Sequence, residues 1–211
     1  MAKINQSPTD IVKNDPVEPY LLLSNSHDGS TAIWIQFTPI RVVCQNTLSY
    51  ALSKRQSDLT AGRASCSIAS TGVPPATASR AFRIRHQGNL QTKLNQAQNA
   101  LDFARQRFAI ATDEYKAMAV VQLNQDDLDL YLSLVLDTGT PQSTRAYPQI
   151  VANFEQGRGN KGQTLWDAYN GVTEWLDYQR GTNDATRLDT AWFGNSAKTR
   201  AIAHQSALEL L

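Results

Sequence analysis

A long apolar stripe in the middle of the chain constrains its fold more than any other feature. Apolar residues recur there at alternating intervals of four and three: Leu90, Leu94, Ala97, Leu101, Ala104, Phe108, Ala111, Tyr115 and Met118. This spacing predicts one helix of roughly 30 residues, about 45 Å long, with a single apolar face. Alanine at three of the nine positions favours packing within the chain over a coiled-coil dimer, and both interpretations remain open.

The residues before the stripe have the pattern of an antiparallel sheet. Two β-prone runs, 18–24 and 31–38, flank a loop with Asp28 and Gly29, which predicts a β-hairpin because glycine supplies the positive φ of a tight turn. Pro39 follows the second run and predicts a bulge or a sheet edge. Residues 81–86 alternate apolar and basic side chains, which predicts a third strand with a basic outer face.

Helix start and stop signals follow the stripe. Predicted helices run from Asn124 to Leu136, from Pro148 to a stop at Gly157, and from Thr164, which resembles the first residue of a capping box. The third helix has the apolar stripe Trp166, Tyr169, Val172 and Leu176, and a last helix from about Asn195 is expected to bury Ile202 and Leu208. Asn46, a favourable N-cap, predicts one more short helix over 46–53.

The fold class that follows is α+β. An N-terminal antiparallel hairpin or sheet with a basic third strand is joined by one long amphipathic helix to a helical C-terminal half. Residues 1–17 lack periodicity and are predicted to be a flexible leader. Residues 18–211 are predicted to form a single domain, mainly β over 18–88 and mainly α over 89–211, with a mobile loop over the Ser-, Gly- and Pro-rich segment 55–79.

The cysteine content, the N-terminal residues and the length of the apolar runs indicate the cellular compartment of the protein. Cys44 and Cys66 fit no zinc pattern, and two thiols in a chain of this length are expected to be reduced, in a cytoplasmic protein. The polar start is not a signal peptide, and no apolar run is long enough for a membrane span, so no membrane partner is predicted.

Charge is polarised along the chain although its net value is only +1. The span from Arg41 to Arg107 contains ten basic and two acidic residues, a net charge of +8. A chain of this kind can present a basic face to an anion. Solvated surfaces without a partner are the other open interpretation.

The basic outer face of the third strand is the strongest candidate for a DNA contact. Alternate residues on a strand lie roughly 7 Å apart, which is similar to the spacing of backbone phosphates. The glycine-rich loop 157–162 resembles an anion cradle before a helix N-terminus, although it lacks the ending of a nucleotide-binding P-loop. The DNA-binding candidates are Arg80, Arg83, Arg85 and His86 on or beside the strand, Arg55 and Arg63 in the preceding loop, and Arg158 and Lys161 in the glycine-rich loop.

Catalytic chemistry finds less support in the sequence. His27, Asp28 and His86 are weak candidates for the metal ligands of a hydrolase, but a turn explains Asp28 before Gly29 equally well. His204 is expected to be structural. No nucleophile and base can be paired, so a protein that is not an enzyme and has no cofactor is the favoured interpretation.

Four blocks resemble, in order, the phage/plasmid-like protein family, a domain-of-unknown-function family numbered 932. The blocks are YLLLSNSHDGS (20–30), TPIRVVCQNTL (38–48), IRH (84–86) and WDAYNGVTEWL (166–176). The resemblance runs from about Asp15 to the C-terminus. It implies a member shortened at its N-terminus, found with phages, plasmids and other transferred DNA, and it brings no known activity or catalytic residues.

The leading functional hypothesis combines the resemblance with the basic strand. It is a phage- or plasmid-associated DNA-binding protein that acts on single-stranded DNA in recombination or replication of mobile elements, with self-association as a further expectation. One alternative is a non-enzymatic protein–protein interaction module built on the stripe from Leu90 to Met118, for example an anti-defence factor. The second alternative is the metal-dependent hydrolase.

Overall fold

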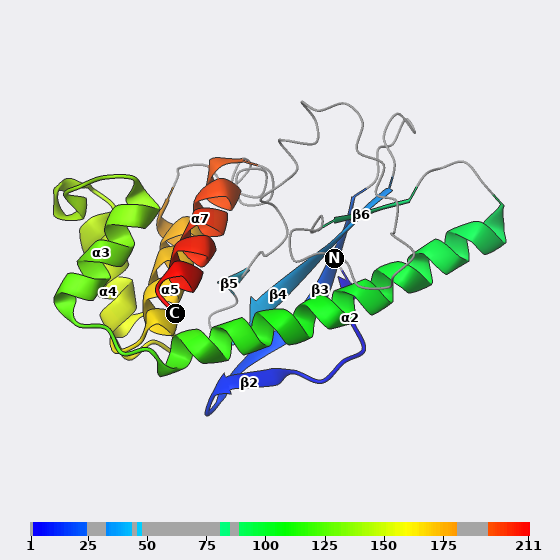
Figure 1. Ribbon diagram of the computed structural model, residues 1–211, viewed down its shortest axis with the longest axis horizontal. Helices are drawn as coiled ribbons and strands as arrows, with labels where there is room; N and C mark the ends of the chain where they lie inside the picture. Colours follow the sequence, from blue (N-terminus) through cyan, green and yellow to red (C-terminus); the bar gives the residue numbers. More distant parts are fainter. Residues whose placement is uncertain (1, 25–32, 44–45, 48–80, 85–88, 181–193) are drawn as a thin grey trace.

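The computed structural model describes residues 2–24, 33–43, 46–47, 81–84, 89–180 and 194–211. Over these residues the protein is α+β, as the sequence predicts: an antiparallel sheet comes first, then one long helix, then a group of shorter helices (Figure 1). The loop predicted over 55–79 lies outside the described residues.

A central strand pair organises the sheet. The strands are β1 (Ala2–Lys3), β2 (Thr9–Val12), β3 (Asp15–Ser24), β4 (Ile33–Arg41), β5 (Asn46–Thr47) and β6 (Ala81–Ile84). β3 and β4 pair antiparallel from Val17↔Arg41 to Ser24↔Trp34, which confirms the two strands of the predicted hairpin. β1 and β2 pair with β3, whereas β5 and β6 pair with opposite ends of β4.

The predicted flexible leader over 1–17 is wrong. Residues of that segment form β1, β2 and the start of β3, with Asn14 in the left-handed conformation in the turn between β2 and β3. Three of its apolar residues, Ile4, Ile11 and Val17, are buried, but polar residues and prolines separate them too widely for a period to be visible. The helix predicted from Asn46 is also wrong at its start, because Asn46–Thr47 is β5.

Pro39 does not interrupt β4, as the sequence suggested, since the ladder continues without a register shift to Arg41. Pro39 lies directly opposite Pro19, and the Pro19 carbonyl accepts a hydrogen bond from Ile4 N on the other side of β3. The backbone groups of Pro19 therefore point away from β4, as they do in a non-hydrogen-bonded pair. At such a pair neither proline removes a hydrogen bond between β3 and β4.

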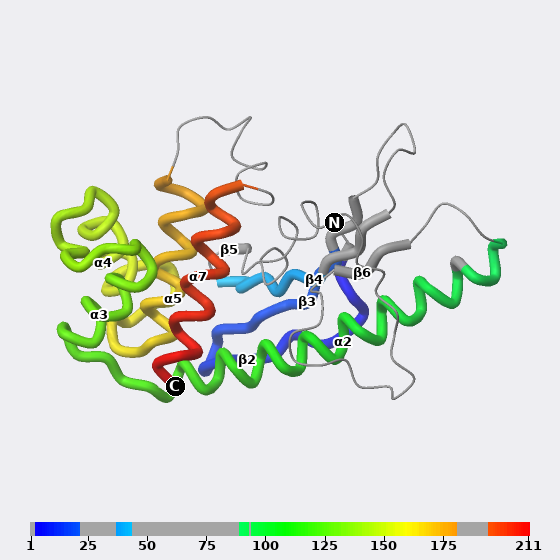
Figure 2. Tube along the Cα trace, turned by 45° about the horizontal axis from the view of Figure 1, so that its top comes forward, coloured from blue at the N-terminus to red at the C-terminus, as the bar shows by residue number. Residues whose placement is uncertain are grey.

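The long helix is α2 (Leu90–Val120), which confirms the prediction from the apolar stripe. Asn89 caps it, because the Asn89 side chain accepts a hydrogen bond from Thr92 N. The stripe is buried from Ala104 to Met118, whereas Leu90 and Leu94 are 73% and 54% exposed. Figures 1 and 2 show why: the first turns of α2 extend beyond the described strands, its middle crosses the sheet, and its end meets the C-terminal helices.

The remaining elements are α3 (Gln125–Leu136), η1 (Pro141–Ser143), α4 (Tyr147–Gln156), α5 (Leu165–Glu174), η2 (Trp175–Gln179) and α7 (Asn195–Glu209). Capping boxes begin α3 at Asn124 and α5 at Thr164. η2 continues α5 directly as a π-helical turn. The predicted buried stripe of α5 is confirmed in Trp166, Tyr169, Val172 and Leu176, but Ile202 on α7 is 47% exposed rather than buried.

One face of the sheet and the inner side of α2 share a continuous core. Val17 and Leu21 of β3 are buried together with Phe37 of β4, and the Phe37 ring meets the edge of Phe108 on α2 with centroids 6.1 Å apart. Further along α2, the Tyr115 ring lies against Trp166 of α5, at 4.8 Å between centroids. α2 therefore spans both halves of the core.

Candidate nucleic-acid interface

A buried arginine at the end of β4 holds the glycine-rich loop 157–162. The Arg41 guanidinium donates to both carboxylate oxygens of Asp15, from Nε and from Nη2, at 2.6 Å each. It also donates to Asn160 Oδ1 at 2.7 Å and to the Gly159 carbonyl at 3.0 Å. A buried charge is tolerated only when it is paired and hydrogen-bonded. Here Asp15 supplies the counter-charge, and the loop supplies two further hydrogen-bond acceptors.

The same cluster joins the sheet to α5. The indole Nε1 of Trp166 donates to Asp15 Oδ2 at 2.9 Å, and the Arg41 guanidinium carbon lies 5.4 Å from the Trp166 ring centroid. Three segments distant in sequence therefore meet at one buried carboxylate. Neither Asp15 nor Arg41 stands out in the sequence as a functional residue, apart from the charge of Arg41 beside the apolar pair Val42 and Val43.

The backbone of the loop is closely fitted to this anchor. Gly159 has a φ of +78°, and a Cβ atom there would lie 2.9 Å from both Arg41 Nη2 and Val43 Cγ1. Asn160 Nδ2 donates to the Asn153 carbonyl at 2.8 Å, which ties the loop to the end of α4. The loop thus has a defined conformation.

The loop is not an anion cradle of the kind the sequence suggested. The backbone N–H groups of Gln163 and Thr164, just before α5, donate to Asp167 Oδ2 at 3.1 and 3.2 Å. Asp167 N in turn donates to Thr164 Oγ1 at 3.2 Å. The carboxylate of the capping box therefore occupies the place that a phosphate would take at this helix N-terminus.

The side chains of Arg158 and Lys161 remain candidates, because both residues are exposed on the anchored loop. The Arg158 guanidinium carbon lies 5.5 Å from the ring centroid of Tyr178, which is 43% exposed. A second pair lies on the same turn of chain, where the Arg180 guanidinium carbon is 5.2 Å from the Trp175 ring centroid. We name Arg158, Lys161, Trp175, Tyr178 and Arg180 the arginine–aromatic surface.

Two carboxylates near this surface are bound to groups of the protein itself, whereas a third, that of Glu155, lies exposed next to Gly162. Glu174 Oε2 accepts a hydrogen bond from the backbone N–H of Arg158 at 3.3 Å. Asp177 forms an ion pair with the fully buried Arg200. Arg180 Nη1 donates to Thr199 Oγ1 at 2.9 Å, and burial lowers the pKa of Arg180 below its ordinary value. An arginine keeps its charge at neutral pH despite such a shift.

The structure separates the two groups of predicted DNA-binding residues. Arg83 lies on β6 directly opposite Trp34, near the start of β4, whereas Arg41 contacts the loop from the end of β4. Seven strand positions span about 24 Å. Arg83 and the Arg158–Lys161 loop are therefore not parts of one compact site. The other candidates, Arg55, Arg63, Arg80, Arg85 and His86, lie outside the described residues.

The charge count along the sequence overstates the basic surface. Arg41 forms a buried ion pair with Asp15. Arg107 is 8% exposed, and its guanidinium carbon lies 5.2 Å from the Phe103 ring centroid. Arg105 pairs with Asp102 at 3.3 Å. Three of the ten basic residues in the +8 span thus have partners within the protein.

No group of three metal-ligating side chains lies close together in the part of the chain that the structure describes. His27, Asp28 and His86 fall outside that part. His204 is 3% exposed, with Nε2 3.3 Å from Glu114 Oε2 and its ring 5.7 Å from that of Tyr169. This is the structural position expected for His204.

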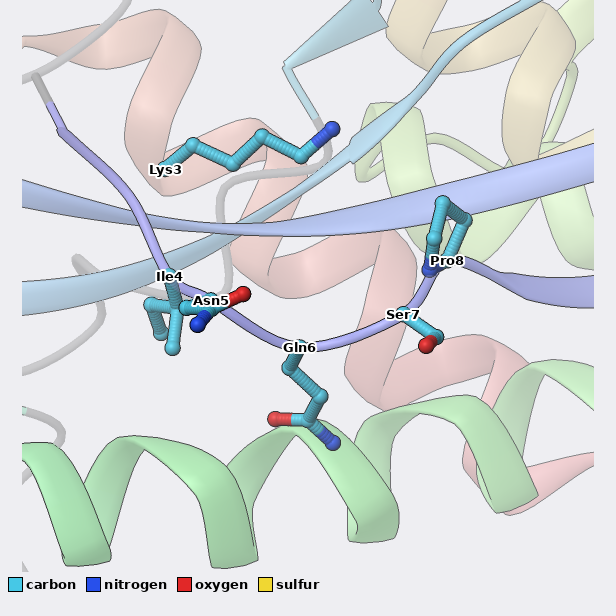
Figure 3. Close-up of a pocket in the computed structure, with 6 residues that line it drawn as sticks. All are labelled: Lys3, Ile4, Asn5, Gln6, Ser7 and Pro8. Atoms are coloured by element: carbon cyan, nitrogen blue, oxygen red, sulfur yellow. The ribbon is translucent and has the colours of Figure 1, made fainter.

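A hollow of about 440 Å³ lies along the connection from β1 to β2 and is lined by Lys3, Ile4, Asn5, Gln6, Ser7 and Pro8 (Figure 3). In this view Gln6 points towards the ribbon of α2 and Lys3 points away from it. Lys3 Nζ donates to Glu18 at 2.5 Å, and this hydrogen bond lowers the pKa of Glu18. Lys3, the titratable residue of this lining, is therefore already paired within the protein.

The geometry defines an α+β protein in which a buried Asp–Arg pair fixes a basic loop beside an exposed tyrosine, Tyr178. The chain belongs to the family described as domain of unknown function DUF932, whose model matches residues 1–61 and 70–205. The match includes residues 1–14, which the sequence analysis had assigned to the leader. No curated protein and no solved structure matches the chain. Among the described helices, none is both long and apolar enough to cross a membrane.

Proposed function

We propose that this protein binds DNA and acts in recombination or replication of phage, plasmid or related mobile elements, in the cytoplasm. The observation that carries the proposal is the pair of exposed cations, Arg158 and Lys161, on a loop that buried Arg41 fixes from within. Phosphate contacts by lysine and arginine supply most of the affinity of non-specific DNA binding. A loop that is already ordered loses little conformational entropy when it makes such contacts.

The basic strand β6 supports the same function at a second place. β6 pairs with β4 in the register Trp34↔Arg83, so position 83 is opposite an aromatic residue. Basic and aromatic residues at neighbouring positions of a sheet are the combination that single-strand-binding sheets use.

The proposal is tested by fluorescence anisotropy with labelled DNA over a salt series. Arg158→Glu with Lys161→Glu should weaken binding and reduce the slope of log K against log salt by about 1.4 to 1.8, since each phosphate contact contributes roughly 0.7 to 0.9. Lys116→Glu with Arg145→Glu makes the same charge change at two exposed positions elsewhere and should have a small effect. Arg83→Glu with Arg85→Glu measures how much Arg83 on β6 and Arg85, which follows the strand in the sequence, contribute to binding.

Absence of wild-type binding at low salt would overturn the DNA-binding proposal. Equal losses in the loop variant and in its control would show that net charge alone attracts DNA, and the loop would then have no specific role.

A second candidate function is a protein–protein contact at the start of α2, and the exposure of Leu90 and Leu94 favours it. These two residues continue the buried stripe one helical turn apart, beyond the described strands. Leu90→Gln with Leu94→Gln should convert any self-associated wild-type protein to monomer, as measured by light scattering during size-exclusion chromatography. A wild-type protein that is already monomeric, and whose pull-downs do not differ from those of the variant, would exclude this function.

A further inference from the structure

We propose that the arginine–aromatic surface is a base-stacking site that selects single-stranded nucleic acid over duplex. This inference rests on the proposed DNA-binding function and names the class of substrate. It adds Trp175, Tyr178 and Arg180 to the loop residues Arg158 and Lys161. The motivating geometry is the pair of arginine–aromatic contacts, at 5.5 and 5.2 Å, on one turn of chain.

The exposure of Tyr178 is the first reason to assign it a ligand. Three other tyrosines of the helical half, Tyr115, Tyr131 and Tyr169, are at most 1% exposed, and the Tyr131 hydroxyl donates to the Ala203 carbonyl. Tyr178 is 43% exposed on the same side as an exposed arginine. Large amphipathic rings left at a surface are typical of binding sites.

The second reason is that the turn carrying these rings is held in place. η2 is a π-helical turn, a rare conformation that occurs frequently at functional sites. Trp175 Nε1 donates to Gln149 Oε1 at 3.0 Å, and Gln179 exchanges two amide hydrogen bonds with Asn153 at 3.0 and 3.1 Å. The Arg180 N–H closes the turn on the Trp175 carbonyl at 2.7 Å.

Chemistry then indicates the ligand. Nucleobases stack on aromatic rings and on the planes of arginine guanidinium groups, and every base has such a face. In a duplex those faces are covered by neighbouring base pairs, whereas a single strand can present them. Arg158, which lies against the Tyr178 ring, and Lys161 on the same loop would neutralise the phosphates of the same strand.

Three probes of equal length separate stacking from phosphate contact: a single strand of thymidines, a duplex, and an abasic single strand that keeps the sugar–phosphate backbone. We expect wild-type protein to bind the thymidine strand more tightly than either of the others. Tyr178→Ala should weaken binding of the thymidine strand by roughly 5- to 150-fold, the range measured for loss of one stacked base, and should leave abasic binding unchanged.

Tyr178→Phe keeps the ring and should retain wild-type affinity. Leu134→Ala removes a similarly exposed apolar side chain from α3 and should also bind as wild type does. Equal wild-type affinity for thymidine and abasic strands, or equal losses of both on Tyr178→Ala, would overturn the stacking site while the DNA-binding proposal stands. No binding of any probe at low salt would overturn both.

Discussion

Asp15 accepts hydrogen bonds from Arg41 and Trp166, which lie 26 and 151 residues further along the chain. Asp15→Asn keeps the size of the side chain but leaves the Arg41 guanidinium buried without its counter-charge. We expect a loss of about 3 to 5 kcal/mol in the free energy of unfolding, as is usual when one partner of a buried ion pair is removed. Urea unfolding followed by tryptophan fluorescence measures it.

Asp10→Asn is the matched control, because Asp10 is an exposed aspartate in the neighbouring strand. Its effect should stay within about 0.5 kcal/mol. Similar losses in the two variants would show that the Asp15–Arg41 pair contributes no more to the free energy of unfolding than an exposed aspartate does.

Gly159 is the second residue on which the loop depends. Gly159→Ala places a Cβ atom 2.9 Å from Arg41 and Val43 at a φ of +78°. We expect a loss of about 1 to 3 kcal/mol from the strained backbone and the displaced guanidinium. Gly139→Ala is the control, since a Cβ atom there meets nothing within 4 Å. Chemical denaturation of both variants tests this, and an unaffected Gly159→Ala protein would contradict the close fit of the loop.

Asp129 should make the free energy of unfolding depend on pH. Its carboxylate accepts hydrogen bonds from Tyr147 Oη at 2.6 Å and from Gln142 Nε2 at 2.6 Å, and the Tyr147 hydrogen bond lowers the pKa of Asp129 below 3.8. Burial, followed by the hydrogen bond to Asp129, raises the pKa of Tyr147 to about 12. Because the folded pKa of Asp129 is depressed, its contribution is present above the unfolded pKa and is lost as pH falls through the folded pKa.

Tyr147→Phe removes this hydrogen bond. We expect it to lower the free energy of unfolding by about 1 kcal/mol at neutral pH. The difference from wild type should begin to shrink as pH falls below 3.8 and should vanish as pH falls through the lower pKa of folded Asp129, where its carboxylate becomes protonated. Urea unfolding at both pH values checks this, and a difference that is independent of pH would mean that the ring packing of Tyr147, not its hydrogen bond, is responsible.

Residue-scale chemistry was predictable only where it is local. The capping residues Asn124 and Thr164 bind groups three positions away, so the sequence shows both ends of each interaction. The partners of Asp15 and Arg41 are brought together by the fold, and no spacing in the sequence reports them. Arg200 is fully buried beside Asp177 while Ile202 is exposed, so α7 departs from the rule that its apolar residues face inward.

At the scale of elements, α2 was predictable because its stripe repeats over its whole length. What the stripe could not show is that only part of it is covered. Phe108→Ala should cost about 3 to 5 kcal/mol, as for other fully buried aromatic residues, because Phe108 is 1% exposed against Phe37. Leu94→Ala, at 54% exposure on the same stripe, should cost less than about 1 kcal/mol.

Guanidinium unfolding of the two variants measures this gradient along α2. Similar large losses would mean that the first turns of the helix are packed as firmly as its middle. Such a result would also remove the basis for a protein–protein contact at Leu90 and Leu94.

The short strands show the opposite case. β1, β2 and β5 are 2, 4 and 2 residues long, and a period of two cannot be recognised over so few residues. They are strands because β3 and β4 offer free backbone edges, which is a property of the assembled sheet. Sequence reasoning therefore identified the central pair and the third strand, which is β6, and missed β1, β2 and β5.

At the scale of the whole molecule, two kinds of contact between the sheet and the C-terminal helices stand out among the described residues. α2 runs through both, and the Asp15–Arg41 pair joins β3 and β4 to α5 and the loop 157–162. The α2 contact is apolar and extended, whereas the second is polar and concentrated at one buried carboxylate. Two such connections predict that the sheet and the helices unfold as one cooperative unit.

Hydrogen exchange separates the two connections. In the wild type, amides of β3 and of α5 should exchange through the same global opening, with equal free energies. In Asp15→Asn the concentrated connection is broken while α2 remains, so the amides of β3 should exchange with a lower free energy than those of α5. If β3 and α5 stay equal in the variant, α2 alone couples the two halves, and the Asp15–Arg41 pair serves only to position the loop that carries Arg158 and Lys161.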